Sequence, residues 1–561
     1  MKKSLSKRNR RVQLGLGVLI ILVGLLMGLS VPRSVWLEVK FSGDNASFQL
    51  HTTPGWSVLG RVRFLTSEDG QIWQQRTQDG TGWDGWQGEV AVGDAAVLHV
   101  KAVLTDVLGQ HHETTNTFVT TVAKAYAPLD DVIEALANSL IQADPNQRVQ
   151  LVGLIKNTKD KRFLPYLVEL YRFWNTPPLQ AALESLSGQR FLGTQALRRW
   201  YEWLWAQPFT FDESFFDWKR ALLAHEIPAM KPLLHAQGTL DWTHVVWGGV
   251  PPGGIRPLNG PAVTTPTAAS YLKDDDIVFG ALVNGQARAY PLRILDWHEM
   301  VNDVLGGVPV VLSYCPLCGS ALLFERQLGD TVYEFNTSGL LLDSNKLMFD
   351  EQTKSLWPNL TGEPVAGPLA GGAGLKRLSL TISSWAVWRT RHPDGDVVAA
   401  GNDGLLTYEG HEAYDLYRVS DETLAPVSRV DERLAAKDWV FGLVVEGRAV
   451  AFAVSDLQRA QVWNTSIGPQ NVVLVAEAVP GSQHGFLPAA VRAFLRGTRT
   501  FTQGNDALVD QNGVRWTVCE EGLCSDQQGV LLPRLLGETG YWFAWSTFHP
   551  DTELRDLNQG R

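Results

Sequence analysis

Cysteine is scarce in this chain of 561 residues, which contains four. A small scaffold held together by disulfide bonds has a far higher cysteine density, so that class of protein is excluded. Charged residues are also sparse, at 19% of the sequence, and 49 Lys and Arg are outnumbered by 59 Asp and Glu. Because phosphate binding needs a basic surface, this acidic balance argues against nucleic acid as a partner.

Basic residues gather at the start of the chain. The first eleven residues contain six Lys and Arg and no Asp or Glu, which leaves 43 (49 minus 6) basic against 59 acidic residues elsewhere. Leu14 to Val31 follows as an apolar run of eighteen residues, long enough to cross a bilayer. Basic residues beside such a run stay in the cytoplasm. Residues 1–32 are therefore predicted to be a cytoplasmic tail and a single transmembrane anchor, with the body outside the cytoplasm at the cell membrane.

A cleaved signal peptide is the alternative for this segment. Gly28-Leu29-Ser30 offers the small residues that a cleavage site needs. The apolar run is longer than a usual signal core, which favours the uncleaved anchor. Both alternatives place the body outside the cytoplasm, in a compartment where disulfide bonds form and persist.

The length of the chain predicts a multidomain protein. Residues 35–125 alternate strand-like runs with turn signals, which predicts a small β-sandwich of the immunoglobulin-like type. Residues 127–206 repeat short helical units, typical of a HEAT-like segment, with a plain helical bundle as the alternative. Residues 207–239 are predicted to be a linker. The front half looks like interaction architecture, so a protein partner is expected to dock on the β-sandwich or on the helical segment.

From about residue 240 the chain contains one β-rich unit of α+β type twice, at 240–400 and 401–555. Each unit starts as a strand, a two-residue turn and a second strand, and the starts align without a gap at an offset of 162 (438 minus 276). The matching segments are Asp276–Gly280 with Asp438–Gly442, Gly285–Leu292 with Gly447–Val454, and Trp385–Asp394 with Trp542–Asp551. Features that both copies keep serve the shared fold, so His392 and His549 are interpreted as structural.

Cysteine and histidine distinguish the first copy from the second. The first copy has Cys315 and Cys318 in a Cys-Pro-Leu-Cys turn after an apolar run, and His298 shortly before that run. At the same offset the second copy has Ala460 in place of His298 and no cysteine in Glu477–Pro480. The joint absence of these three residues is expected if they form a single functional unit that the second copy has lost, although simple sequence drift gives the same pattern.

Two thiols and one imidazole suit a metal ion. Both sulfurs of a Cys-x-x-Cys turn reach the same side, and His298 adds a nitrogen if Leu292–Leu305 forms a helix beside the strand. The sequence thus predicts one copper or zinc ion held by His298, Cys315 and Cys318. Glu299 is then the candidate catalytic acid or base. Other polar side chains available to orient a ligand or a bound water are Asp296, Asn302 and Asp303.

Other chemistry is open to the same residues. Cys315 and Cys318 could cycle between a dithiol and a disulfide, although Ser320–Arg326 is strand-like where a glutaredoxin-like site has a helix. Alternatively they form an inert disulfide or a structural metal knuckle in a non-catalytic binding or assembly module. The second pair, Cys519 and Cys524, is predicted to close a hairpin as a disulfide. The 21 Trp are interpreted mainly as core residues, with a ligand-stacking groove as the alternative.

Specific motifs run in a fixed order through the duplicated region. They are Trp247–Val250 with Gly254–Ile255, Ala289–Leu292, Asp296–Glu299 with Asn302–Asp303, Tyr314–Ser320, Ser338–Leu341, Leu347–Asp350, Thr353–Trp357, Thr361–Gly362, Tyr541–Trp545 and His549–Thr552. In these motifs residues 240 to about 555 resemble an uncharacterised bacterial and archaeal family, domain of unknown function 3179. The chain departs from the family pattern at Glu351-Gln352, where Arg is expected, and at Asn359, where Gln is expected. The resemblance implies where the site lies, and it implies no reaction.

Overall fold

The computed structural model describes residues 34–42, 45–53, 61–67, 74–79, 86–91, 97–105, 111–119, 131–401, 408, 413–479, 487–527 and 529–557. The chain forms two compact units, Met1–Leu129 with Pro208–Thr210 and Asp130–Gln207 with Phe211–Arg561. The predicted anchor, Leu14–Val31, lies outside the described residues. Among the residues that are described, no helix is long and apolar enough to cross a membrane.

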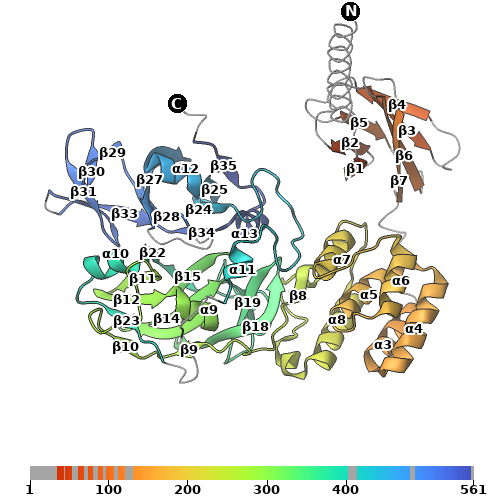
Figure 1. Cartoon of the computed structure of the whole chain (residues 1–561), viewed down its shortest axis with the longest axis horizontal. Coiled ribbons are helices and arrows are strands. Elements are labelled where there is room, and N and C mark those ends of the chain that lie inside the picture. The colour runs from red at the N-terminus through yellow and green to blue at the C-terminus, as the bar shows by residue number, and fades with distance from the viewer. Residues whose placement is uncertain are drawn as a thin grey trace, which may run out of the picture. The chain divides into compact units, whose positions relative to one another are not determined.

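The first unit contains two antiparallel sheets, of three strands in the order β1-β2-β5 and of four in the order β4-β3-β6-β7 (Figure 1). The strands are β1 Ser34–Ser42, β2 Asn45–Thr53, β3 Arg61–Ser67, β4 Gln74–Asp79, β5 Trp86–Ala91, β6 Val97–Thr105 and β7 His111–Val119. A β-rich unit is what the sequence predicts for residues 35–125. The immunoglobulin-like type of sandwich stays a prediction.

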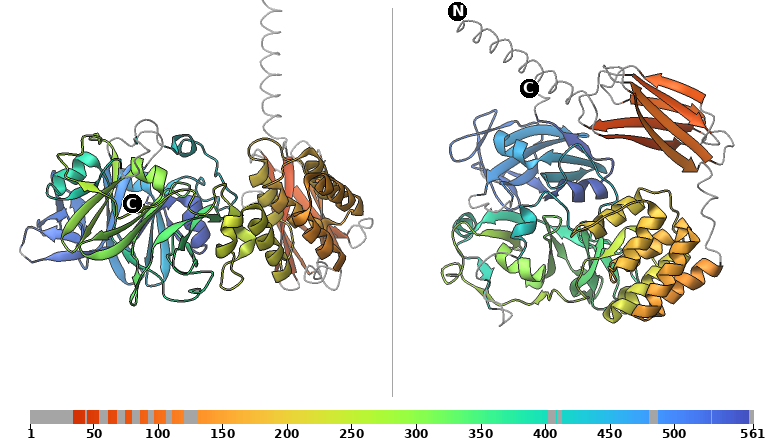
Figure 2. Two further views of the ribbon diagram at one scale, coloured as in Figure 1. Left: turned by 90° about the horizontal axis from the view of Figure 1, so that it is seen from below. Right: turned by 45° about the vertical axis from the view of Figure 1, so that its right-hand side comes forward.

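The second unit opens with a layer of helices, which lie side by side (Figure 2). They are α3 Asp131–Gln142, α4 Pro145–Thr158, α5 Leu164–Tyr171, α6 Pro177–Ser187, α7 Ala196–Trp205 and α8 Glu213–Glu226. Local sequence sets their ends. The Asp144 side chain accepts from the N–H groups of Asn146 and Gln147 at the start of α4, and Gly188 ends α6 in the left-handed conformation.

Helix α8 lies within residues 207–239, which the sequence predicts to be a linker. Lys219 of α8 forms a buried ion pair with Glu169 of α5, with nitrogen and oxygen 2.6 Å apart. Trp218 of α8 donates its ring N–H to the Ala137 carbonyl of α3 at 2.7 Å. This part of the segment is therefore a helix packed into the helical layer. Its polar side chains are buried and paired with α3 and α5, whereas those of an exposed linker would contact water.

The rest of the second unit contains one series of elements twice. In the first copy it runs β11 Ile277–Val283, β12 Gln286–Pro291, α9 Leu292–His298, β13 Met300–Leu305, β14 Val308–Cys315 and β15 Ser320–Glu325. In the second copy it runs β24 Trp439–Val445, β25 Arg448–Ala453, α12 Val454–Ala460, β26 Val462–Ile467, β27 Gln470–Ala478 and β28 Ala489–Leu495. From β11 to the start of β14 every bound differs from its counterpart by 162 residues, as 439 minus 277 illustrates.

Each copy closes on itself with the same three elements. They are β22 Thr381–Ser384, α10 Trp385–Arg391 and β23 Asp396–Val398 in the first copy, and β34 Gly537–Tyr541, α13 Trp542–Phe548 and β35 Glu553–Arg555 in the second. β22 pairs antiparallel with β11 as β34 does with β24, and β23 pairs parallel with β12 as β35 does with β25. The two copies thus share their topology as well as their sequence ends.

Further short elements complete the second unit. They are β8 Val245–Trp247, β9 Leu258–Asn259, β10 Val263–Thr264, β16 Gln327–Leu328, β17 Thr331–Val332, β18 Phe335–Leu342, β19 Asn345–Asp350, β20 Leu356–Pro358, β21 Lys376–Leu378, α11 Asp415–Arg418, β29 Phe501–Gln503, β30 Leu508–Asp510, β31 Arg515–Val518, β32 Gly522–Ser525 and β33 Leu531–Leu535. β20, β19, β18 and β8 form one sheet in that order. Cys519 and Cys524 form a disulfide where β31 turns into β32, which confirms the predicted closed hairpin.

The segment Leu292–Leu305, predicted to be helical throughout, is a helix only as far as His298. Glu299 takes a positive φ of 55°, and its N–H donates to the Leu295 carbonyl at 2.7 Å. That left-handed residue ends α9 and turns the chain into β13. Gln461 occupies the same position in the second copy, with a φ of 58° and the same bond to Leu457 at 2.7 Å.

Tryptophan packs against glycine at the same point of each copy. Gly280 of β11 lies against the Trp388 ring, and Gly442 of β24 lies against the Trp545 ring. The histidine that follows contacts each tryptophan ring at a tilt, with His392 4.2 Å from Trp388 and His549 4.0 Å from Trp545 between ring centroids. These repeated contacts belong to the shared fold.

Gly280→Ala is expected to lower the free energy of unfolding by about 1–3 kcal/mol. An added Cβ would lie 2.0 Å from the Trp388 ring, which has no room to move. Gly153→Ala is the matched control, because nothing lies within 4 Å of a Cβ there and alanine favours the α4 helix by up to about 1 kcal/mol. Urea unfolding of both variants measures the difference, and equal stability of Gly280→Ala and wild type would contradict the packing.

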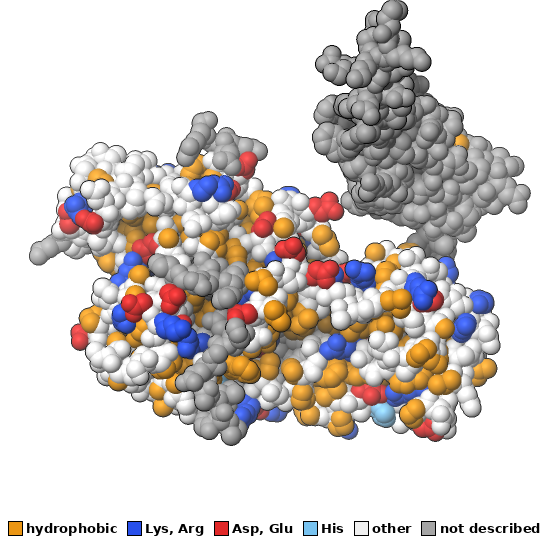
Figure 3. Space-filling model, viewed as in Figure 1, with side chains coloured by type: hydrophobic (Ala, Val, Ile, Leu, Met, Phe, Trp, Pro, Cys, Tyr) orange, Lys and Arg blue, Asp and Glu red, His pale blue; other side chains and the backbone are white. Residues whose placement is uncertain are grey.

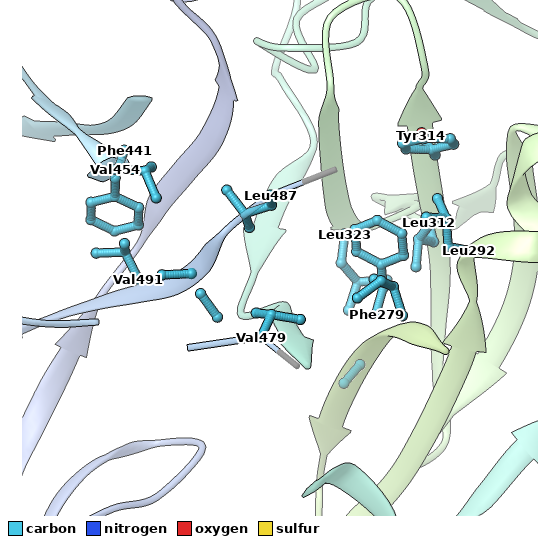
Figure 4. Packing of buried hydrophobic residues seen from close by; sticks show 14 of the residues in the cluster. Phe279, Leu292, Leu312, Tyr314, Leu323, Phe441, Val454, Val479, Leu487 and Val491 are labelled. Atoms are coloured by element: carbon cyan, nitrogen blue, oxygen red, sulfur yellow. The ribbon is translucent and has the colours of Figure 1, made fainter. Parts of the chain in front are cut away.

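One hydrophobic core joins the two copies (Figure 4). Phe279, Leu312 and Leu323 contribute to it from the first copy, and Phe441 and Val491 from the second. Because they share this core, the two copies fold as one body, and a residue of one copy can complete a site of the other.

On the face shown in Figure 3, acidic, basic and apolar side chains are interspersed.

Candidate functional site

The Cys-Pro-Leu-Cys turn connects β14 to β15, and its two cysteines form a disulfide with Cα atoms 5.4 Å apart. Cys315 is 1% exposed and Cys318 is 0% exposed. The second copy holds the turn in place: Tyr541 donates its N–H to the Cys318 carbonyl at 2.8 Å. Gly319 has a φ of 66°, and a Cβ there would meet the Trp439 ring at 2.6 Å. The turn thus needs glycine on both grounds.

Buried polar side chains surround the disulfide. The Asn345 amide donates to the Cys318 sulfur at 2.9 Å, and the Asn359 amide donates to the Ser320 hydroxyl at 3.2 Å. Among the buried atoms that make no hydrogen bond within the described residues are the hydroxyls of Ser313 and Ser344 and the amide oxygens of Asn345 and Asn359. Burying such a group without a partner costs about 1–3 kcal/mol. Burying these polar groups without partners lowers the stability of the fold, which points to a functional site at this turn.

Lys346 and Glu299 lie behind the same turn. The Lys346 ammonium donates to the Glu299 carbonyl at 3.0 Å and to the Tyr314 carbonyl, one residue before Cys315. Its nitrogen is 3.7 Å from a carboxylate oxygen of Glu299. Burial lowers the pKa of Lys346 to about 8, and the Glu299 charge opposes this shift. Tyr414 donates its hydroxyl to the other Glu299 oxygen at 2.6 Å.

A short segment of the connection between β23 and β24 lies over the turn. We refer to Tyr414–Arg418, which includes α11, as the cover segment. Tyr417 donates its hydroxyl to the Leu317 carbonyl inside the Cys-x-x-Cys turn at 2.7 Å. Arg418 forms an ion pair with Asp296, with side chains 1% and 0% exposed. These contacts hold the cover segment against the residues that carry the disulfide.

His298 is buried and directed to other partners. Its Nδ1 lies 2.8 Å from the Arg256 carbonyl and its Nε2 lies 2.6 Å from the Tyr408 hydroxyl. Within the ranges that the structure describes, no group of three or more His, Cys, Asp or Glu side chains is placed to hold a metal ion. The structure therefore brings Cys315 and Cys318 together with each other, and it gives His298 a different set of contacts.

The other candidate side chains divide into two groups. Glu299 and Asp296 contact the cover segment through Tyr414 and Arg418. Asn302 instead bonds the backbone of Phe335 at 2.8 and 2.9 Å, as Asn464 does with Phe501 in the second copy. Asp303 pairs with Arg288 at 2.7 Å. Asn302 and Asp303 therefore support the fold, as their contacts lie away from the disulfide.

Asn345, Lys346, Tyr414 and Arg418 belong to the site, and sequence reasoning missed all four. One signal was present: Asp343–Lys346 is a run of four polar residues between the apolar runs Leu340–Leu342 and Leu347–Phe349. Asn359, one of the departures from the family pattern, does lie beside the turn. Glu351 and Gln352 bond Lys354 and the Glu334 backbone instead.

Comparison with known proteins assigns the β-rich region to a family and supplies no activity. Neither the search of curated proteins nor the search of solved structures finds a match. Residues 252–552, which include the Cys-Pro-Leu-Cys turn and both copies of the series of elements, match the model of the family described as protein of unknown function DUF3179. With more than half of its length matched, the chain belongs to the DUF3179 family.

Proposed function

We propose that the first copy is a thiol–disulfide redox site in which Cys315 and Cys318 alternate between a disulfide and a dithiol. The observation that carries this proposal is that the second copy forms the same strand pairing without the two cysteines. β27 and β28 pair there as β14 and β15 do in the first, with Glu477 in the place of Cys315. Since the same strand pairing forms without cysteine, the fold does not require the Cys315–Cys318 bond.

The surroundings of the sulfurs support exchange chemistry. A donor at Asn345 faces the Cys318 sulfur, and hydrogen bonds of this kind favour a thiolate over a thiol. In the proposed step, a thiolate of an external dithiol attacks one sulfur, breaks the Cys315–Cys318 bond and forms a mixed disulfide. The other cysteine leaves as a thiolate in this first step, and the second thiolate of the donor then attacks the donor sulfur of the mixed disulfide and releases the cysteine bonded to it. The donor leaves as a disulfide, and the protein keeps two electrons and two protons as a dithiol.

The cellular setting is part of the proposal. The run Leu14–Val31 supports a single membrane anchor, and two disulfides in one chain support a body outside the cytoplasm. A redox partner protein would dock on the β-sandwich or on the helical segment; stacked helical repeats form extended surfaces that other repeat proteins use for binding.

Equilibration with defined ratios of reduced to oxidised dithiothreitol tests the redox proposal. We expect Cys315 and Cys318 to become alkylated together while circular dichroism stays native, and to reoxidise when the ratio is reversed. The Cys315→Ser, Cys318→Ser double variant is expected to lose no more than about 2 kcal/mol of stability, the chain entropy of so short a loop. Alkylation that occurs only on unfolding would refute the proposal.

A non-catalytic binding or assembly module with a structural disulfide is the second candidate. Near-complete burial of both cysteines favours it, because a bond that is never exchanged needs no access. The same experiment separates the two: a structural bond resists reduction until the protein unfolds, and its removal costs more stability than the loop entropy.

Copper or zinc binding by His298, Cys315 and Cys318 stays a prediction. The sulfurs are bonded to each other and both His298 nitrogens have other partners, so a metal would need reduced cysteines and a reoriented ring. Metal analysis of the reduced protein and of Cys315→Ser measures this directly. Equal metal in both proteins, or none in either, would remove the metal site.

A further inference from the structure

The second copy contains a cavity of about 640 Å³ that the redox proposal does not use. Its lining includes Arg391 and His392 from the end of α10 in the first copy, and Gln461, Glu477 and Trp516 from the second. Pockets for small molecules in proteins span about 300–1,000 Å³, so its size suits a small organic ligand. We refer to it as the second-copy cavity.

The second-copy cavity occupies the place that corresponds to the redox site of the first copy. Gln461 is the counterpart of Glu299 at the end of the short helix, with the same positive φ. Trp516 is the counterpart of Trp357: each donates its ring N–H to an aspartate, at 3.2 and 3.0 Å. In the first copy the Tyr414 hydroxyl reaches Glu299, whereas in the second copy Gln461 lines open space.

The lining favours positive charge. Four carboxylates line the second-copy cavity against Arg391 as the one Lys or Arg side chain among the described lining residues. These carboxylates are Glu477, Asp506, Glu520 and Glu521. Burial opposes ionisation of Glu520, yet His392 and the cations Arg492 and Arg534 lower its pKa to about 2. Glu477 is paired with Arg391 and Arg492, and Glu520 is paired with Arg492 and Arg534. The charges that face a ligand are therefore those of the exposed Asp506 and Glu521, which attract a cation and repel an anion.

Apolar side chains form the rest of the wall. Val475, Ala476, Leu508 and Val518 line the second-copy cavity beside the charged groups. Contact with such a wall removes apolar ligand surface from water, which favours binding by roughly 25 cal/mol per Å². A ligand that uses both parts of the lining therefore carries a positive group on an apolar body.

We propose that the second-copy cavity binds small organic cations in which an ammonium group is attached to an apolar body. The inference goes beyond the redox site: the cavity has no cysteine of the first copy in its lining. The second copy has thus lost the thiol chemistry and kept a ligand site at the equivalent position.

Three probes with one aromatic body test this proposal by titration calorimetry on the full chain. They are 2-phenylethylamine, which is a cation, 2-phenylethanol, which is neutral, and 3-phenylpropionate, which is an anion. We expect the amine to bind at least about tenfold more tightly than the alcohol, and the carboxylate not to bind, as a charge contact of about 1.4 kcal/mol implies. Equal or tighter binding of the carboxylate, or no binding of the amine, would overturn the proposal.

Two variants locate the binding. Asp506 and Glu521 line the cavity and are exposed, so they are not part of the hydrophobic core. The double variant Asp506→Asn, Glu521→Gln is expected to weaken amine binding about tenfold without loss of stability. The Cys315→Ser, Cys318→Ser double variant is the control and is expected to bind the amine as wild type does. Amine binding that is lost only in the cysteine variant would place the ligand in the first copy and overturn the proposal, whatever the outcome of the redox test.

Discussion

Arg418→Ala is expected to make the Cys315–Cys318 disulfide at least about tenfold more reactive toward a small phosphine reductant. Arg418 and Asp296 pair with side chains 1% and 0% exposed, and Arg418 also donates to the Tyr314 hydroxyl at 3.1 Å. Breaking a buried ion pair by removing one partner costs about 3–5 kcal/mol. Because this pair fixes the cover segment over the turn, its loss opens access to the sulfurs. Timed alkylation with mass spectrometry measures the rate.

The second disulfide of the same molecule is the internal reference for this experiment. Cys519 and Cys524 lie in a surface hairpin far along the chain, and their reduction rate is expected to stay unchanged in Arg418→Ala. Arg459→Ala is the matched control variant, since Arg459 pairs with Asp456 at the surface and such pairs contribute about 0–1 kcal/mol. Equal acceleration of both disulfides would indicate general loosening and would contradict the role of the cover segment.

Local patterns made the β-rich region predictable to a large extent. The hairpin signals at Asn284-Gly285 and Glu446-Gly447 depend on neighbouring residues alone, and the structure has a tight turn between paired strands at both points. The absence of cysteine from Glu477–Pro480, the second-copy counterpart of the turn, marked Cys315–Cys318 as a feature of the first copy alone. A disulfide at this turn was one of the alternatives that the sequence left open.

Tertiary contacts decided what the sequence could not. Glu299 ends α9 in a left-handed conformation, which a non-glycine residue rarely adopts without support from the fold. The direction of the His298 ring follows from partners 42 and 110 residues away in sequence, at Arg256 and Tyr408. The cover segment lies in the connection between β23 and β24, where no periodicity marks it. Sequence spacing thus located the turn and could not locate what surrounds it.

Lys346→Met is expected to remove a rise in stability of about 3 kcal/mol that wild type shows between pH 8 and pH 10.5. Burial lowers the pKa of Lys346 in the folded protein from 10.5 to about 8. Between these two values the unfolded chain binds one proton that the folded chain does not, so the free energy of unfolding increases with pH. Methionine keeps the length and volume of the side chain and removes the titrating group.

The comparison that isolates Lys346 is the difference between wild type and variant at each pH, since buried tyrosines also titrate above pH 10. Lys376→Met serves as the control, because Lys376 is exposed and pairs with Glu325 at the surface. Urea unfolding at steps from pH 7.5 to pH 10.5 gives the slope of the free energy of unfolding against pH for each protein. If the free energy of unfolding changes with pH equally in wild type and Lys346→Met, the Lys346 amine is not held in the low-polarity interior behind Tyr314. A slope lost in Lys346→Met and kept in Lys376→Met would show that the fold stores an unfavourable charge next to its disulfide, a feature that is concentrated at functional sites.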